Sequence, residues 1–266
     1  MQTIDDKAEI IRQWNNDPCG GVNGIEPGTS AYYASVDYER YVNYAPWLPE
    51  VMRFDQFAGK KLLEVGFGQG TDLYQFAKNG ALVSGIDITP RHYELTRRRF
   101  ELADLSADLR LGDAEAMPFA NESFDAVYSF GVIHHSPDTQ KIIDEIHRVL
   151  KPGGRAIIGV YHTWSAYNIF NFAVNYMLKL RVLRESFRKH MSRVEHRENS
   201  NACPLVKTYG KREFGKMLSR FTSTRLVVAH LRTHDLSRAV GFRVPDAIAR
   251  MLEPYFGWYL IAQCVK

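Results

Sequence analysis

Three alternating glycines that follow an apolar run constrain the fold of this chain more than any other feature. The run covers residues 62–65, and the glycines are Gly66, Gly68 and Gly70. Such a run predicts a buried strand, and the glycines allow a loop in which a ligand lies against bare backbone. A helix is expected next, because apolar residues recur at helical spacing as far as Gly80, where a left-handed cap is expected. This unit of strand, glycine loop and helix is how α/β folds hold nucleotide-like ligands.

A carboxylate at the end of the next expected strand indicates that the ligand contains a ribose. Residues 81–87 read as that strand, and Asp87 comes 21 residues after Gly66, close to the ~20 expected for a ribose-binding acid. The glycine spacing disfavours a dinucleotide, because the third small residue of that motif would be Thr71, whereas the third glycine comes early, at Gly70. A phosphate-cradling loop is disfavoured too, since no Gly-Lys-Ser/Thr sequence follows the glycines.

Four blocks of sequence, in this order and spacing, resemble one enzyme family. The blocks are the glycine loop at Gly66, Asp87 with Ile88, residues 112–115, and residues 124–154. They resemble the class I methyltransferases that use S-adenosylmethionine. Within that class they are similar to the methyltransferase type 11 group, which includes the ubiquinone/menaquinone C-methylases. The resemblance covers about residues 60–162.

The resemblance implies S-adenosylmethionine as the cofactor and a set of residues that hold it. These are Glu64, Gly66, Gly68, Gly70, Asp87, Ile88, Asp113, Ala114 and Phe130. It implies that the glycines line the methionine and ribose, that Glu64 helps to orient the methionine amino group, and that Asp87 accepts both ribose hydroxyls. Ile88 would pack on the adenine face, Asp113 and Ala114 would address the adenine edge, and Phe130 would lie near the methionine. Phe67 is bulkier than its counterpart in many relatives, which raises a question about the loop's shape.

Alternation of expected strands and helices predicts an α/β fold with a doubly wound, Rossmann-like, mainly parallel sheet and a ligand crevice at the strand carboxyl ends. In the family this sheet has seven strands, with paired strands at its end. We expect Ser136 to cap the helix after residues 124–130, and the next strand to span residues 156–161. The chain then divides into four parts. They are an N-terminal lid segment (1–56), a cofactor-binding core (57–162), a helical basic insertion that caps the substrate (163–222) and C-terminal strands that complete the sheet (223–266).

Three histidines lie where central strands are expected to end. His134 and His135 follow one strand and His162 the next, so the three are candidates for a base that takes the acceptor's proton. A structural or substrate-orienting role is the alternative, because paired histidines at this place are widespread in the family. Methyl transfer from a sulfonium is an in-line displacement that requires no metal, and the scattered Cys and His residues have no metal-ligand spacing.

The segments before and after the core carry the aromatic and basic residues. Aromatic side chains crowd residues 32–47, where they form either a lid that excludes water or a packing face on the sheet flank. Residues 179–220 contain 12 Lys/Arg and 4 Asp/Glu, a balance of +8 in a chain whose net charge is +4. Residues 163–178 are uncharged but too short for a membrane span, and a helix continuing to about His190 is expected. That region is interpreted as a roof over the substrate pocket or as a surface for anionic groups.

Composition favours a cytoplasmic protein. The three cysteines are odd in number and widely spaced, which argues against a disulfide framework, and the polar, acidic first residues argue against a secretory signal. The leading functional prediction is methyl transfer to a small-molecule acceptor, with an oxygen nucleophile on a sugar, lipid or natural product. If the basic insertion contacts the acceptor, the acceptor is expected to be anionic or amphipathic, and peripheral contact with a membrane is possible. A nucleic-acid acceptor is disfavoured because no RNA-binding module is recognisable. Two alternatives remain: a methyltransferase acting on a nucleic-acid or membrane-associated anionic substrate, and a noncatalytic S-adenosylmethionine-binding scaffold. The oligomeric state is left open.

Overall fold

A seven-stranded mixed sheet forms the centre of the protein. The computed structural model describes residues 2–178, 180, 183, 187–192, 205–231, 233, 237 and 243–266. The strands of this part are β1 (Lys61–Val65), β2 (Leu82–Asp87), β3 (Asp108–Leu111), β4 (Phe124–Phe130), β5 (Leu150–Tyr161), β6 (Ser223–Ala229) and β7 (Tyr259–Val265). Their order is β3-β2-β1-β4-β5-β7-β6, and β7 runs antiparallel to both of its neighbours, whereas β1 to β5 are parallel. The order reverses between β1 and β4, where such folds place their ligands.

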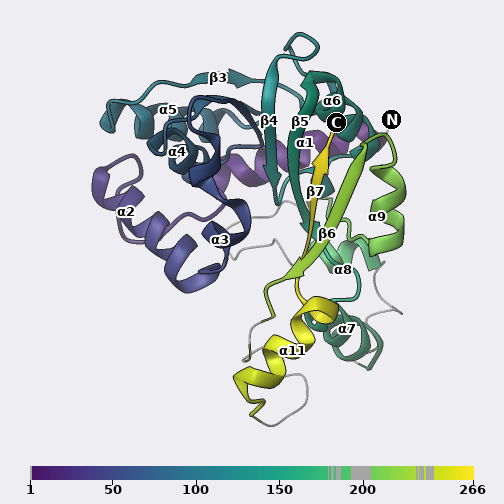
Figure 1. The fold of residues 1–266 in the computed structure, drawn as a ribbon. Coiled ribbons are helices and arrows are strands. Elements are labelled where there is room, and N and C mark those ends of the chain that lie inside the picture. Colours follow the sequence, from purple (N-terminus) through teal and green to yellow (C-terminus); the bar gives the residue numbers. More distant parts are fainter. Residues whose placement is uncertain are drawn as a thin grey trace.

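Helices pack on both faces of this sheet, which confirms the doubly wound fold (Figure 1). One face is covered by α4 (Thr71–Lys78), α5 (Pro90–Leu102) and α3 (Leu48–Met52), and the other by α6 (Thr139–Val149) and α9 (Lys211–Met217). In β1, Leu62 packs on the face that α4 covers and Leu63 on the face that α6 covers, and both side chains are fully buried. A strand covered on both faces is apolar at successive positions, which accounts for the apolar run before the glycines.

The N-terminal segment lies over α4, α5 and the crevice. It contains α1 (Gln2–Asn16), α2 (Ser30–Tyr38), the π-helix η1 (Glu39–Tyr44), α3 and the 3₁₀ helix η2 (Phe54–Phe57). Tyr33 is buried, and its hydroxyl donates to the Leu95 carbonyl oxygen of α5 at 2.6 Å. Tyr44 instead faces the cavity described below and bonds Tyr259 through their hydroxyls at 2.7 Å. The aromatic residues therefore divide between packing on the flank and lining the crevice.

Two local predictions in the core are wrong. Helix α6 begins at Thr139 and is capped by Asp138, whose carboxylate accepts the Lys141 N–H at 3.0 Å, so Ser136 is not the cap. Ser136 ends the 3₁₀ helix η4 (Ile133–His135), and its hydroxyl donates to Glu115 instead. Strand β5 begins at Leu150 rather than at Ala156, because Phe124 pairs with Leu150 before the register shifts.

The insertion after β5 starts as α7 (Ala166–Phe170) and η5 (Asn171–Leu178), followed by α8 (Phe187–Ser192). The helix expected to continue to His190 is not continuous, because Leu180 has a positive φ of 52°. Arg181 and Arg184 lie outside the described residues. Between β6 and β7 the chain forms α11 (Asp246–Phe256), which the sequence did not lead us to expect; α11 and α7 are both drawn at the foot of Figure 1. In the described part no helix has the length and apolarity that a membrane span needs.

Candidate cofactor and active site

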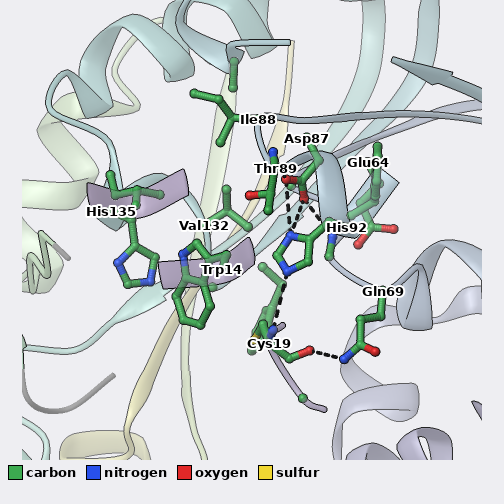
Figure 2. Close-up of a pocket in the computed structure, with 18 of the residues that line it drawn as sticks. Trp14, Cys19, Glu64, Gln69, Asp87, Ile88, Thr89, His92, Val132 and His135 are labelled. Atoms are coloured by element: carbon green, nitrogen blue, oxygen red, sulfur yellow. Dashed lines mark hydrogen bonds and ion pairs between the residues drawn. The ribbon is translucent and has the colours of Figure 1, made fainter. Parts of the chain in front are cut away.

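A cavity of about 560 Å³ opens at the carboxyl ends of β1, β2 and β4 (Figure 2), within the size range of small-ligand sites. Eight of the nine residues predicted to bind the cofactor line it: Glu64, Gly66, Gly68, Asp87, Ile88, Asp113, Ala114 and Phe130. The exception is Gly70, which is the N-cap of α4 behind the loop. The N-terminal segment closes the cavity with residues of α1, residues 19–21 and η1. Residues far apart in the sequence thus share one chamber.

The three glycines of the loop serve different purposes. All three have positive φ, at +76° for Gly66, +55° for Gly68 and +71° for Gly70. A Cβ on Gly66 would lie 2.3 Å from Val132 Cγ2, and one on Gly70 would lie 2.7 Å from Thr96 Cγ2, so these two permit close packing. A Cβ on Gly68 would meet no atom of the described residues within 4 Å. Gly68 therefore leaves bare backbone toward the cavity, as a ligand in close contact with the loop requires.

Phe67 does not distort the loop. Its ring is buried, and it packs over Gly85 of β2, where an added Cβ would lie 2.5 Å from Phe67 Cδ1. The bulky residue is matched by a missing side chain on the neighbouring strand, which answers the question that the sequence raised.

Asp87 is a buried carboxylate at the end of β2, held by several donors. Its oxygens accept the Gly68 N–H and the Thr89 N–H, each at 2.9 Å, and His92 Nδ1 lies 3.2 and 3.3 Å from them. Burial alone would raise the pKa of Asp87, but His92 and the two backbone N–H groups outweigh it and hold this pKa below its usual value. Asp87 is thus an ionised acceptor next to the open glycine, as a ribose diol requires.

Glu64 differs from Asp87 in its partners. It lies in the penultimate position of β1, its side chain is buried, and its Oε2 atom has no hydrogen-bond partner among the described residues. Burial raises the pKa of Glu64 well above its usual value, and the nearby carboxylate of Asp72 raises it further. An unsatisfied buried carboxylate is costly on its own and is stabilised by a cation. Glu64 therefore fits a ligand that carries an ammonium group.

A partly buried network that the sequence did not reveal borders the same chamber. Arg40 of η1 donates to Asp72 Oδ2 at 2.6 Å, and the hydroxyls of Tyr41 and Tyr128 donate to the two Asp72 oxygens at 2.7 and 2.6 Å. Burial would raise the pKa of Asp72, but Arg40 and the two hydroxyls lower it overall. The Arg40 guanidinium also lies 5.1 Å from the centre of the Phe130 ring. An arginine within the aromatic stretch was the only sequence signal for this network.

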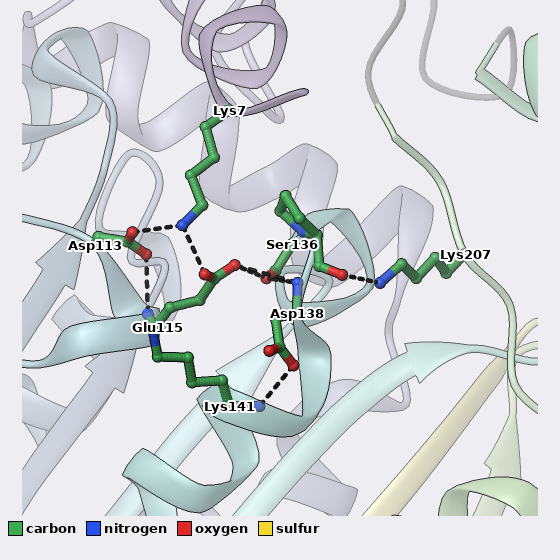
Figure 3. Close-up of polar contacts among 8 residues, drawn as sticks. Lys7, Asp113, Glu115, Ser136, Asp138, Lys141 and Lys207 are labelled. Carbon is green, nitrogen blue, oxygen red and sulfur yellow. Dashed lines mark hydrogen bonds and ion pairs between the residues drawn. The ribbon is translucent and has the colours of Figure 1, made fainter. Parts of the chain in front are cut away.

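The end of the cavity that is lined by Asp113 is bridged to α1 (Figure 3). Lys7 Nζ lies 2.6 Å from both Asp113 Oδ2 and Glu115 Oε2. Asp113 also accepts the Glu115 N–H at 2.9 Å, and Glu115 accepts from the Ser136 hydroxyl at 2.5 Å and the Asp138 N–H at 3.2 Å. Asp113 is thus held in place at the edge of the cavity, and the helix that carries Lys7 lies across that edge.

The three candidate histidines occupy different environments. His135 lines the cavity, and its Nδ1 lies 2.7 Å from the Leu205 carbonyl oxygen. His134 is fully buried away from the cavity lining, and burial together with His135 holds its pKa well below the usual value. His162 is buried outside that lining too; its Nδ1 donates to the Gly257 carbonyl at 3.2 Å, and burial lowers its pKa. Of the three, only His135 contributes to the cavity wall, and the catalytic role of each stays a prediction.

S-adenosylmethionine fits the residues of this chamber. The backbone of Gly68 is open to close contact with this ligand, and the ionised Asp87 can accept hydrogen bonds from its ribose hydroxyls. The buried Oε2 of Glu64 can accept from its ammonium group. Within the described ranges, no group of three or more His, Cys, Asp or Glu side chains could hold a metal ion.

Comparison with known proteins identifies the domain that carries this cavity. Residues 63–158 match a family described as a methyltransferase domain. Methyltransferase GfsG of Streptomyces halstedii is 37% identical over 109 residues, which are 40% of this chain and 39% of that protein. The 27-O-demethylrifamycin SV methyltransferase of Amycolatopsis mediterranei is 35% identical over 105 residues, 38% of this chain and 39% of that protein. The chain therefore spans less than half the length of these curated relatives.

A solved structure extends the likeness in fold to most of the chain. It is the complex between the Haloferax volcanii Trm112 methyltransferase activator and the putative methyltransferase. One of its chains superposes with a TM-score of 0.57 at 17% identity, covering 91% of this chain and 99% of that one. At this identity the likeness concerns the fold and not the acceptor.

Proposed function

We propose that this protein transfers a methyl group from S-adenosylmethionine to a hydroxyl oxygen of a small-molecule acceptor. The match of residues 63–158 to a methyltransferase-domain family supports methyl transfer. The observation that carries the proposal is the pairing of an open glycine loop with two buried carboxylates, the ionised Asp87 and the unpartnered Glu64. S-adenosylmethionine supplies a methyl group bonded to a positively charged sulfur. The nucleophile attacks the methyl carbon opposite the sulfur, which leaves as the thioether of S-adenosylhomocysteine. The chain's contribution is to hold the methyl donor and the acceptor at the distance and angle that the transfer requires, and to exclude water.

An oxygen acceptor agrees with the state of His135. The Leu205 carbonyl accepts a hydrogen bond only if His135 Nδ1 carries the proton, so Nε2 of the neutral ring is the basic nitrogen. A hydroxyl must lose its proton during methyl transfer, and a neutral imidazole at the cavity wall is able to take it. One relative, the 27-O-demethylrifamycin SV methyltransferase, is named for a substrate that lacks a methyl on oxygen.

The experiment that tests this proposal begins with the acceptor. Host extract is incubated with the protein and methyl-labelled S-adenosylmethionine, and mass spectrometry identifies the compound that gains one labelled methyl. With that compound in hand, His135→Ala is expected to lower kcat about 100-fold or more while the Kd for S-adenosylhomocysteine stays unchanged. His162→Ala is the matched control, since His162 lies outside the cavity lining. Unchanged turnover in His135→Ala would reject His135 as the base, and failure of the wild-type protein to bind S-adenosylhomocysteine would reject the enzyme.

A second candidate, an anionic or amphipathic acceptor at a membrane surface, is favoured by the outer face of the insertion. Large apolar side chains are exposed there, with Trp164 at 63%, Phe172 at 45% and Leu178 at 74% of their maximum. The sequence from 179 to 220 carries the net charge of +8. Such a pairing is typical of surfaces that attach to anionic bilayers. Under this candidate the protein co-sediments with phosphatidylserine vesicles and is released by salt, whereas no binding at low salt would exclude it.

A further inference from the structure

The peptide unit of Cys19 is held from both sides above the cavity (Figure 2). Its N–H points at His92 Nε2 on α5, with the nitrogens 3.4 Å apart, and its carbonyl oxygen accepts from Gln69 Nε2 at 2.7 Å. Gln69 stands inside the glycine loop and in turn accepts from the Tyr32 hydroxyl of α2. Cys19, Gly20 and Gly21 all line the cavity. The segment that closes the chamber is therefore bonded directly to the loop and helix that frame the ligand.

These contacts define the protonation of the His92 ring. A backbone N–H is only a donor, so Nε2 must accept from Cys19 and the ring proton must be on Nδ1. Nδ1 then donates to the carboxylate of Asp87, from which it is 3.2–3.3 Å distant. The ring is buried, and Trp14 of α1 lies beside it with 6.5 Å between ring centres. Each ring nitrogen of His92 thus makes one kind of contact, Nε2 with Cys19 and Nδ1 with Asp87. The ring therefore connects the segment that closes the cavity to the Asp87 carboxylate.

We propose that His92 is a positioning residue that orients Asp87 toward the ribose and makes closure of residues 14–21 over the cavity depend on that orientation. The inference rests on the proposed function, since the ribose belongs to S-adenosylmethionine. Asp87 has four hydrogen-bonding approaches from three partners, and those of Gly68 and Thr89 come from backbone at fixed positions. His92 is the one side chain among these three partners, and it alone also reaches Cys19. Closure and ribose binding therefore share one ring.

Two amide substitutions separate the two tasks of the ring. In His92→Asn the side-chain nitrogen takes the place of Nδ1, so it keeps the bond to Asp87 but does not reach Cys19. In His92→Gln the longer amide reaches the place of Nε2, accepts from the Cys19 N–H and leaves Asp87 without this donor. Glu94→Gln is the matched control, because Glu94 is exposed on the same helix and lies 3.6 Å from Arg91, away from both Asp87 and Cys19. Thermal unfolding of each variant verifies that it is folded.

Two readouts follow each variant. The first is the Kd for 5′-methylthioadenosine and for its 2′-deoxy counterpart, whose ratio measures how well Asp87 recognises the ribose. The second is hydrogen exchange of the peptide that contains residues 14–21, with and without S-adenosylhomocysteine. We expect His92→Gln to weaken 5′-methylthioadenosine binding about 10-fold or more, the effect of losing a hydrogen bond to a charged group, and to bring the Kd ratio toward one. We expect His92→Asn to keep that ratio but to accelerate exchange in residues 14–21 and to abolish their protection by ligand.

The outcomes separate this inference from the proposed function. If neither variant changes the Kd ratio or the exchange of residues 14–21, His92 has no positioning role. If both variants lose binding and exchange protection to the same extent, the ring serves only to fill space, and the proposal is overturned. If the wild-type protein does not bind S-adenosylhomocysteine, the proposed function fails. The exchange rates of the ligand-free variants then still decide whether His92 holds Cys19, since that contact needs no ligand.

Discussion

Replacement of Glu64 by Gln gives the sharpest test of how the cavity recognises its ligand. The substitution keeps the shape of the side chain and removes the negative charge next to the glycine loop. Glu64 Oε2 is buried without a hydrogen-bond partner in the described part of the chain, and burial and Asp72 raise the pKa of Glu64 well above its usual value. The wild-type carboxyl group is therefore destabilised in its ionised form until a cation arrives. Gln carries no such cost.

Affinity and stability are expected to respond in opposite directions. A hydrogen bond to a charged group contributes about 1.5–3 kcal/mol, which at ~1.36 kcal/mol per factor of ten corresponds to a loss of about 10- to 150-fold in affinity for S-adenosylhomocysteine. In the unfolded chain Glu64 ionises near its usual pKa, but the folded state resists ionisation, so above that pKa the carboxyl group opposes folding. Glu64→Gln removes this opposition. Its unfolding midpoint at neutral pH should equal or exceed that of the wild type.

The pH dependence of binding supplies an independent check. The ligand's ammonium group favours ionised Glu64, so binding releases a proton and the affinity rises as pH increases from the usual carboxyl range through the raised pKa of Glu64. Asp72 and Asp87 do not contribute, since their pKa values are lowered and both are already ionised in this range.

Calorimetric titration in buffers of different ionisation enthalpy measures the released proton, which should disappear in Glu64→Gln. 5′-Methylthioadenosine lacks the amino acid and should bind both proteins equally. Equal affinity of the two proteins for S-adenosylhomocysteine, or an equal loss with both ligands, would refute the assignment.

The glycines of the loop should separate packing from ligand contact. Gly66→Ala places a Cβ 2.3 Å from Val132 at a φ of +76°, so overpacking of about 1–3 kcal/mol and left-handed strain should lower stability in urea unfolding; a stable variant would mean that Val132 moves freely. The new Cβ of Gly68→Ala meets no atom of the described residues within 4 Å, so the substitution should lower stability by only the ~1–2 kcal/mol of a left-handed residue. For the same loss of stability, Gly68→Ala should weaken S-adenosylhomocysteine binding more than Gly66→Ala does.

The sequence predicts the core of the fold well where hydrophobic pattern and local turn chemistry agree. Strand β4 begins and ends where its aromatic and β-branched residues predict, and Gly80 has the left-handed conformation, with a φ of +87°, that ends α4. The sequence predicts the start of a helix poorly where two residues could each serve as its N-cap. Ser136 and Asp138 are both good N-cap residues, and the structure uses Asp138 because the Ser136 hydroxyl bonds Glu115, 21 residues earlier. Such a tertiary partner leaves no local pattern in the sequence.

The same limit applies to the site. Asp87 and Gly68 are predictable because a short motif places them at the ends of two adjacent parallel strands, with Gly68 in the loop after β1 and Asp87 as the last residue of β2. Arg40, Lys7 and His92 are not, because each reaches the cavity from a helix whose direction depends on packing. The sequence contains the charged residues but not the geometry that pairs them.

Charge pairing across the cavity connects these observations. The N-terminal segment supplies Arg40 to Asp72 and Lys7 to both Asp113 and Glu115, so three acidic side chains of the wall already have cationic partners. Among the described carboxylates of the wall, Glu64 has the buried oxygen that still lacks a partner. A cation that enters the cavity is therefore expected to bind at Glu64, beside the loop, and not at Asp113 or Glu115. Opening the N-terminal segment would expose competing carboxylates, so closure makes the position of the ammonium group unique. We expect for this reason that Lys7→Met, which removes the cation that pairs with Asp113 and Glu115 and leaves Glu64 itself unchanged, lowers discrimination between ligands with and without the ammonium group more than it lowers stability.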